Sequence, residues 1–356
     1  MTSAPKGIET WLTEGDRAPA AISIRTWLRP VEGADGVVFP PTFAPPEGAA
    51  ARSSGYVIDR LPTGAVCLMD SVGSQSNRME AIFKSGPYSA LVPQVIVEAG
   101  SKSVNLLDAG HRAADAIVRY SQLSADLKSA FSAWRDTGDA MGLAKLAPTS
   151  LVFGVWDSRE TQAKVPRLVS STIRAFDVVS LNRGGQYLPA VDYVAENLVD
   201  PTKVTSDDMS TLGLAHQPLK GTSLLGGVMV RGGIRRDAVL SLIALRDLRA
   251  SDTATTLALR RYVLGLGLVA LTAPQRPHLR QGCILVPDPS KAASSSVVFA
   301  DGREDPFTVT HAEALRLAEE SASAFGVGAS RTVKFSPEKV TEGKAARAKK
   351  SKPKSG

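Results

Sequence analysis

The segment 255–271 constrains the fold more than any other part of the sequence, because it has the pattern of a helix that is apolar on most sides. The longest apolar stretch, residues 262–273, is too short to span a bilayer, which takes about 20 residues. Ser251 and Asp252 provide a break and an N-cap in front of it. Gly265 and Gly267 lie inside the run, where they favour tight helix packing over a dinucleotide-binding turn. We therefore expect a helix packed inside a soluble globular protein.

Strand and helix patterns follow one another irregularly along the rest of the chain. Helices are predicted over residues 108–122, with Asp108 as N-cap, and over residues 238–249. Because this order has no strict βαβα rhythm, it favours the α+β class over a doubly wound parallel sheet. Strands are predicted at residues 22–28, 65–70, 90–98, 151–155, 173–179 and 283–286.

Two segments stand apart from this pattern. Residues 30–48 are rich in Pro and Gly, and a connection of this length predicts a functional insertion or a mobile segment. At the other end, seven Lys or Arg from Glu338 onward face two Glu, and this excess accounts for five of the seven net positive charges. The tail, residues 336–356, has almost no apolar side chains and is predicted to be disordered. Evidence for a nucleic-acid partner must therefore come from the folded body.

The cysteines and the beginning of the sequence point to the cytoplasm. Cys67 and Cys283 are too few and too far apart for a disulfide framework or a metal-binding pair. The first residues lack the apolar core of a secretory signal. We expect a cytoplasmic protein with no membrane contact, no metal and no cofactor.

Residues 150–177 interleave cations with small hydroxyl side chains behind a short apolar run. Guanidinium, ammonium and hydroxyl groups suit phosphate and ribose oxygens, which accept hydrogen bonds and carry negative charge. The stretch holds no nucleophile beside a base. It is interpreted as a grip on a nucleic-acid backbone, with the cations Arg159, Lys164, Arg167 and Arg174 and the hydroxyls of Ser170 and Ser171 as candidates.

Two further clusters carry polar or glycine residues at high density. The run 70–80 contains Ser76, Asn77 and Arg78, whose donors suit sugars, phosphates or base edges, although a solvated helix start explains it as well. Residues 226–236 contain two glycine pairs followed by Arg235 and Arg236, where a helix is expected to begin. Glycine backbone and helix amides beside arginines favour phosphate, and turns with positive φ are the alternative.

Five segments together resemble the CRISPR-associated RAMP-superfamily subunit that forms the crRNA-binding backbone of type I-G (formerly I-U) Cascade-like complexes. They cover most of the chain between residues 70 and 286, and the third is the most specific. The segments are DSVGSQSNRME (70–80), GHRAADAIVR (110–119), SLVFGVWDSRETQAKVPRLVSSTIRAFDV (150–178), GGVMVRGGIRRDAVLSLIALRDLR (226–249) and LRRYVLGLGLVALTAPQRPHLRQGCILV (259–286).

The resemblance implies an RRM-like (ferredoxin-like) palm with inserted finger and thumb elements over residues 1–335, in which residues 30–50 are a mobile or finger insertion. It also implies a non-catalytic subunit that polymerises with further copies of itself along a guide RNA. Its other partners would be the target DNA paired to the guide and the remaining subunits of the complex. The RNA-binding candidates are Ser76, Asn77, Arg78, Arg112, Arg159, Lys164, Arg167, Ser170, Ser171, Arg174, Gly232, Gly233, Arg235 and Arg236.

An enzyme remains the alternative. A metal-dependent nuclease or guide-RNA-processing enzyme would use Asp157, Asp115 or His111, the last two placed four residues apart. A helix ion pair between Asp115 and Arg119 explains Asp115 more simply, and Arg159 is expected to neutralise Asp157. A subunit that must hold any spacer should bind phosphates and riboses and leave base edges free, which fits the first reading.

Overall fold

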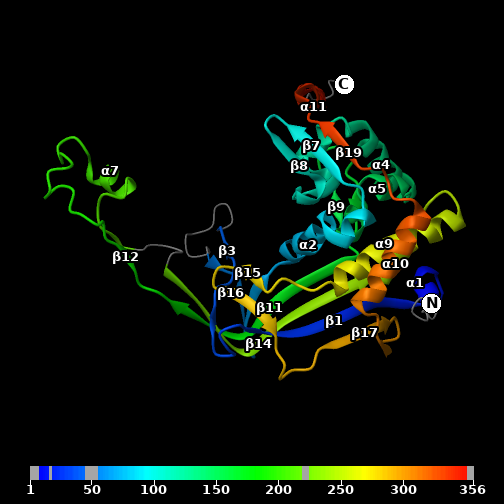
Figure 1. Cartoon of the computed structure of the whole chain (residues 1–356), viewed down its shortest axis with the longest axis horizontal. Coiled ribbons are helices and arrows are strands. Elements are labelled where there is room, and N and C mark those ends of the chain that lie inside the picture. Colours follow the sequence, from blue (N-terminus) through cyan, green and yellow to red (C-terminus); the bar gives the residue numbers. More distant parts are fainter. Residues whose placement is uncertain (1–7, 16–17, 45–54, 219–223, 351–356) are drawn as a thin grey trace, which may run out of the picture.

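The computed structural model describes residues 8–15, 18–44, 55–218 and 224–350, with side chains up to residue 344. A large antiparallel sheet forms its base (Figure 1). Its strands are β1 (Pro19–Pro30), β2 (Val37–Val38), β5 (Ile58–Leu61), β6 (Gly64–Asp70), β11 (Val169–Asn182), β14 (Leu225–Ser241), β15 (His278–Arg280), β16 (Cys283–Pro287), β17 (Ser294–Phe299) and β18 (Glu304–Pro306). Their main order is β15-β16-β1-β14-β11-β6-β5.

Four of these strands form the centre of the sheet in the order β17-β1-β14-β11, and all neighbours are antiparallel. The connection from β1 to β11 carries the segment that begins with β6 and α2 (Val72–Glu80), and the connection from β14 to β17 carries α9 (Thr253–Thr272). The mixture of helices with antiparallel strands confirms the predicted α+β class.

Helices cover one face of the sheet, where α2, α9 and α10 (His311–Phe325) lie above it in Figure 1. The chain enters through α1 (Ile8–Leu12), and α8 (Leu242–Arg246) joins β14 to α9. Asp252 caps α9 as predicted, accepting a hydrogen bond from Thr255 N at 2.9 Å. By length and composition α9 alone among the described helices could cross a membrane, but it is 67% buried and forms the core of the body.

Tight packing against α10 explains the glycine at position 265. A Cβ atom there would lie 2.8 Å from the Ala318 Cα and 2.9 Å from the Ser321 Oγ, which is closer than real Cβ atoms approach. At Gly267 a Cβ would lie 2.7 Å from the Leu240 Cδ1 of the sheet beneath. The predicted tight packing is therefore with helix α10 at Gly265, whereas Gly267 packs against the sheet.

Gly265→Val is expected to lower the free energy of unfolding by about 1–3 kcal/mol, because the added methyl groups must push α10 away from α9. Denaturant unfolding followed by circular dichroism measures the change. Gly110→Val is the matched control, since a Cβ at Gly110 meets no atom within 4 Å. An equal loss in both variants would show that the helix contact is not the cause.

A second body of helices and a small sheet lies between β6 and β11 in sequence (Figure 1). The chain returns to it near the end, where β19 (Arg331–Lys334) pairs in parallel with β7 (Val95–Ala99). Its other elements are β8 (Lys102–Asn105), β9 (Val155–Trp156), β10 (Lys164–Val165), α3 (Ala116–Arg119), α4 (Ser124–Thr137), α5 (Met141–Leu146), α6 (Pro148–Phe153) and the 3₁₀ turns Ala81–Lys84, Gly86–Leu91, Leu106–Asp108 and Arg112–Ala114.

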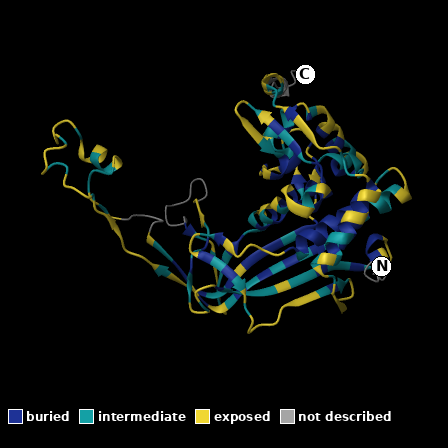
Figure 2. Cartoon of the chain, in the orientation of Figure 1, coloured by how far each residue is buried: buried dark blue, intermediate teal, exposed yellow. Residues whose placement is uncertain are grey.

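An extended arm leaves the sheet between the end of β11 and the start of β14, and Figure 2 shows that it is exposed along most of its length. It contains β12 (Gln186–Tyr187), α7 (Ser206–Thr211) and β13 (Gln217–Pro218). Near its base lie β3 (Thr42–Phe43), which like β2 belongs to the predicted insertion 30–50, and its partner β4 (Gly55–Tyr56), which follows that insertion. Residues 45–50 of that insertion lie outside the described residues.

Several predicted elements are wrong. Residues 151–155 lie mainly in α6, and most of residues 108–122 form short turns because Arg112 has a φ of +51°, which interrupts a helix. The helix expected from residue 238 is strand β14 up to Ser241, since tertiary pairing overrides local propensity there. The tail expected to be disordered contains α11 (Pro337–Lys350), and residues 351–356 lie outside the described residues.

Candidate nucleic-acid interface

The alternation of β14 and β11 divides the candidate residues between two faces of the sheet. Arg236 and its β11 neighbour Ile173 point toward the helices, whereas Arg235 and its neighbour Arg174 point to the opposite face. We call these the helix face and the outer face. One strand of nucleic acid that touched all the candidates would have to contact both faces, so the sequence-based set contains two separate surfaces.

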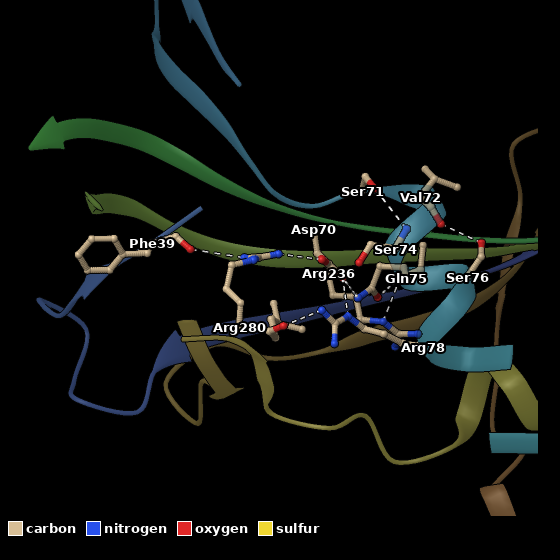
Figure 3. A network of polar contacts seen from close by, with 12 residues as sticks. Phe39, Asp70, Ser71, Val72, Ser74, Gln75, Ser76, Arg78, Arg236 and Arg280 are labelled. Atoms are coloured by element: carbon tan, nitrogen blue, oxygen red, sulfur yellow. Dashed lines mark hydrogen bonds and ion pairs between the residues drawn. The ribbon is translucent and has the colours of Figure 1, made fainter. Parts of the chain in front are cut away.

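A fully buried carboxylate organises the helix face where β6 meets α2 (Figure 3). Asp70 accepts hydrogen bonds from Gln75 Nε2 at 2.7 Å, Arg78 Nε at 3.1 Å and Arg280 Nη2 at 2.9 Å. Ser71 caps α2 by accepting a hydrogen bond from Ser74 N. Asp70 therefore fixes two guanidinium groups beside the start of the helix.

Arg236 continues this network without a carboxylate of its own. The Arg236 Nε donates to Ser171 Oγ at 3.0 Å, and Ser171 Oγ donates in turn to Gln75 Oε1 at 2.9 Å. The Arg236 Nη2 lies 3.7 Å from Met79 Sδ. The residue is only 6% exposed, and burial lowers the pKa of its guanidinium to about 10. Isolated buried charge is costly, which makes this arginine a candidate for binding an anion.

A pocket of about 720 Å³ opens between α2, the helix face of the sheet and the segment that follows α9. Arg78 and Arg236 line it together with Arg276, which is exposed on the segment between α9 and β15. Gln75 and Asn77 add amide groups. The nearby Asp70 carboxylate is already bonded to Arg78 and Arg280, so it does not neutralise all three guanidinium groups of the pocket. The pocket is therefore positively charged and suits phosphate.

The outer face carries a second cluster, made of cations and aromatic rings. The Arg235 guanidinium lies 5.3 Å from the Trp27 ring centre and 5.0 Å from that of Phe176, and Lys291 Nζ lies 4.5 Å from the Trp27 ring centre. Asp237 lies 2.8 Å from Arg235 Nε. Such ring–cation contacts hold the side chains in place on an open sheet face.

The hairpin β9–β10 carries three more candidates. Arg159 is exposed, Lys164 Nζ lies 4.7 Å from the Trp156 ring centre, and Arg167 Nε donates to Phe153 O at 2.8 Å. Burial, aided by the charge of Arg112, lowers the pKa of the Arg167 guanidinium. All three side chains are exposed and thus accessible to a ligand, although Arg167 also holds the Phe153 carbonyl.

Three candidates have structural roles instead. Arg112 is buried, with its Nε 2.7 Å from Glu80 Oε2 but not in hydrogen-bond alignment. Burial raises the pKa of Glu80, and the charge of Arg112 opposes that shift. Ser76 is fully buried and donates to Val72 O at 2.8 Å, while Ser171 is buried in the Arg236 network. All three side chains are buried, which the sequence does not show because it does not tell which side of α2 and β11 is covered. Their contact with RNA stays a prediction.

The glycine cluster is a strand and not a phosphate-binding turn before a helix. A Cβ at Gly232 would lie 2.8 Å from Phe176 O in β11, so this glycine permits close strand pairing. At Gly233, φ is +93° and a Cβ would lie 3.1 Å from the Trp27 ring, which makes room for the outer-face cluster. Ser170, also on β11, is half-buried.

The acids of the enzyme alternative serve local turns. Asp157 accepts hydrogen bonds from the backbone and hydroxyl of Thr161 at 2.7 and 2.6 Å, so the expected pairing with Arg159 was wrong. Asp115 caps α3 by accepting a hydrogen bond from Ile117 N at 3.1 Å, in place of the expected helix pair with Arg119. In the described part of the chain, no three His, Cys, Asp or Glu residues are grouped to hold a metal.

Sequence reasoning missed several residues that complete these surfaces. Asp70 and Gln75 lie in the polar run that was singled out, but Arg276, Arg280 and Lys291 come from distant loops and strands. Trp27 lies in a predicted strand with nothing in its neighbourhood to mark it. Only the pairing of β1 with β14 brings Trp27 next to Arg235.

Comparison with known families gives one match, which covers part of the chain. The family model described as CRISPR-associated protein GSU0053 matches residues 22–180. This range includes β1, β6, α2 and the β9–β10 hairpin, and with them three of the five segments on which the resemblance rests. The match confirms the resemblance to a CRISPR-associated family. No curated protein matches the sequence.

Two solved structures are similar at a low level. The crystal structure of Csc2 from Thermofilum pendens is 11% identical, covers 98% of this chain and 81% of that chain, and gives a TM-score of 0.27. A chain titled CRISPR RNA-guided surveillance complex is 10% identical, covers 86% of each chain and gives a TM-score of 0.24. Because both TM-scores are below 0.5, neither alignment supports a statement about fold or function.

Proposed function

We propose that this chain, whose residues 22–180 match a CRISPR-associated family, is a non-catalytic subunit of a Cascade-type effector complex in the cytoplasm. It binds the guide RNA, polymerises along it with further copies of itself, and presents it to target DNA beside the other subunits. The observation that carries this proposal is the cationic pocket between α2 and the helix face, with its buried Arg236, whose described contacts include no carboxylate.

The strand order supports an RRM-like palm. In a ferredoxin-like βαββαβ unit the four strands lie side by side in the order fourth, first, third, second. The order β17-β1-β14-β11 is the same when β1, β11, β14 and β17 are taken as the first to fourth strands. The second body and the arm are then insertions after β6 and between β11 and β14, in the positions of finger and thumb elements.

The chemistry of the pocket suits a guide of any sequence. Guanidinium groups of Arg78, Arg236 and Arg276 are donors to phosphate oxygens, and the amides of Gln75 and Asn77 suit ribose hydroxyls. Phosphate contacts carry no sequence information, so base edges stay free for pairing with target DNA.

Charge and exposed apolar side chains on the arm support self-assembly. Residues 183–218 hold five acidic and two basic residues, whereas the whole chain is positive at +7. Leu188, Leu198 and Leu212 on the arm are each more than 60% exposed. An acidic arm with apolar anchors is complementary to the basic surface of a second copy.

Arg276→Ala is expected to weaken guide-RNA binding for all spacer sequences alike and to flatten the slope of log K against log salt by about 0.7. Fluorescence anisotropy with three unrelated spacers measures both. Arg331→Ala, which removes an equal charge from β19, is the control. Loss for one spacer only would indicate base readout and contradict the proposal. Cleavage of the same RNA with Mg²⁺ would favour the nuclease alternative.

A further inference from the structure

The outer face of the sheet has the composition of a ligand-binding surface and is separate from the guide pocket. In Figure 1 the large helices lie above the sheet, and the described residues place no helix beneath it. Contacts between these helices and the sheet involve helix-face residues, as Arg236 with Met79 of α2 and Leu240 with Gly267 of α9 show. The outer face therefore remains accessible along β1, β14 and β11.

Four cations surround two aromatic rings on this face. The Arg25 side chain is 61% exposed and that of Arg235 is 28% exposed, and both lie near the carboxylate of Asp237, at 3.9 and 2.8 Å. Arg174 is exposed and donates to Thr172 Oγ1, while Lys291 lies over Trp27. The outer-face cluster consists of Arg25, Trp27, Arg174, Phe176, Arg235 and Lys291, with Asp237 between them.

The geometry favours nucleic acid over an apolar protein segment. Trp27 and Phe176 meet edge to face with ring centres 6.3 Å apart, and both are half-buried, so they form a fixed platform and not a mobile patch. A base can stack on such a ring or on the Arg235 guanidinium plane, and Lys291 can turn from the ring to a phosphate. The hydroxyls of Ser23 and Ser296, which pair between β1 and β17, border the cluster and can donate hydrogen bonds to the phosphate–sugar backbone of a nucleic acid.

We infer that the outer face is a second binding surface for single-stranded nucleic acid, in which Trp27 stacks a base while Arg25, Arg174 and Lys291 hold neighbouring phosphates. It is distinct from the guide pocket, because a sheet separates Arg235 from Arg236. Every base has a flat face, so this surface binds without strong sequence preference. Single-stranded RNA and DNA share the required chemistry.

Trp27→Ala should weaken the binding of fluorescein-labelled dT20, U20 or both about 5- to 150-fold, the effect of losing one base–aromatic stack. Trp27→Phe should retain most of the affinity, because it keeps a ring. Arg174→Ala should weaken binding and flatten the salt dependence by about 0.7. Arg331→Ala is the control for charge, and thermal unfolding checks that each full-length variant is folded. The more affected of the two probes identifies the source of the strand.

The pocket variant separates this inference from the proposed function. Arg276→Ala should weaken guide-RNA binding. In the Arg276→Ala background, Trp27→Ala should still weaken the binding of dT20 or U20 as much as it does in the unchanged protein. Photo-crosslinking of 4-thiothymidine-labelled dT20, mapped by mass spectrometry, should mark peptides of β1 or β11. The inference is overturned if Trp27→Ala leaves binding of both probes unchanged, or if it changes only the self-association measured by sedimentation. Equal losses for the same strand in Trp27→Ala and Arg276→Ala would mean one continuous site and would also overturn it.

Discussion

Arg112→Ala should lower the free energy of unfolding by about 3–5 kcal/mol, because it leaves the Glu80 carboxylate buried without its counter-charge. Guide-RNA affinity of the folded protein should change little, since Arg112 is enclosed by Glu80, Gly154 and Phe153. Denaturant unfolding and anisotropy on the same preparation measure the two quantities.

The pH dependence gives this prediction a second readout. Burial already raises the pKa of Glu80, so the folded state favours its protonated form more than the unfolded chain does. Removing Arg112 strengthens that preference, and the stability loss should therefore be smaller near pH 5 than near pH 8. Replacing both partners, as Glu80→Leu with Arg112→Met, should cost less than Arg112→Ala alone. A lower RNA affinity with unchanged stability would show that Arg112 faces the guide.

Arg236→Met should have the opposite effect on stability. Arg236 is as deeply buried as Arg112 but has no carboxylate partner among its described contacts, so the folded state carries an uncompensated charge. An apolar side chain of similar length should raise the free energy of unfolding by about 1–4 kcal/mol. Ser171 Oγ keeps its hydrogen bond to Gln75, so the change leaves no new unsatisfied hydroxyl.

The same replacement should weaken guide-RNA binding about 10- to 150-fold, the range for losing one hydrogen bond to a charged group. A gain in stability with a loss of affinity identifies a charge that is retained for its ligand. Arg331→Met is the control, and it should change neither quantity strongly because Arg331 lies on the surface with Asp126. Lower stability with unchanged affinity would instead make Arg236 a structural residue.

The sequence predicts the elements whose pattern depends on local residues. The apolar α9 with its Asp252 cap, strands β1, β6 and β16, and the α+β class follow from periodicity and capping alone. The boundary between β14 and α8 does not, because apolar residues at positions 238–249 suit a helix as well as a strand. Pairing with β1 and β11 decides it, and that contact is between residues far apart in sequence.

The same limit applies to the site. Composition correctly marks β11, β14 and α2 as rich in donors, and Arg78, Arg174 and Arg236 each line or border one of the two surfaces. Composition does not tell Arg235 from Arg236, which are adjacent in sequence and point to opposite faces. Nor does it show that Arg112 meets Glu80, because that ion pair forms only when the turn at Arg112–Ala114 packs near the end of α2.

The central claim is that the folded body holds a guide RNA without reading its sequence. Its most direct test is to express the chain in cells with a CRISPR array of many spacers, purify it, and sequence the RNA that copurifies. We expect guide RNAs from all spacers in proportion to their abundance, and their loss when Arg236 and Arg276 are both replaced. Recovery of one spacer alone, of RNA unrelated to the array, or of no RNA would contradict the account.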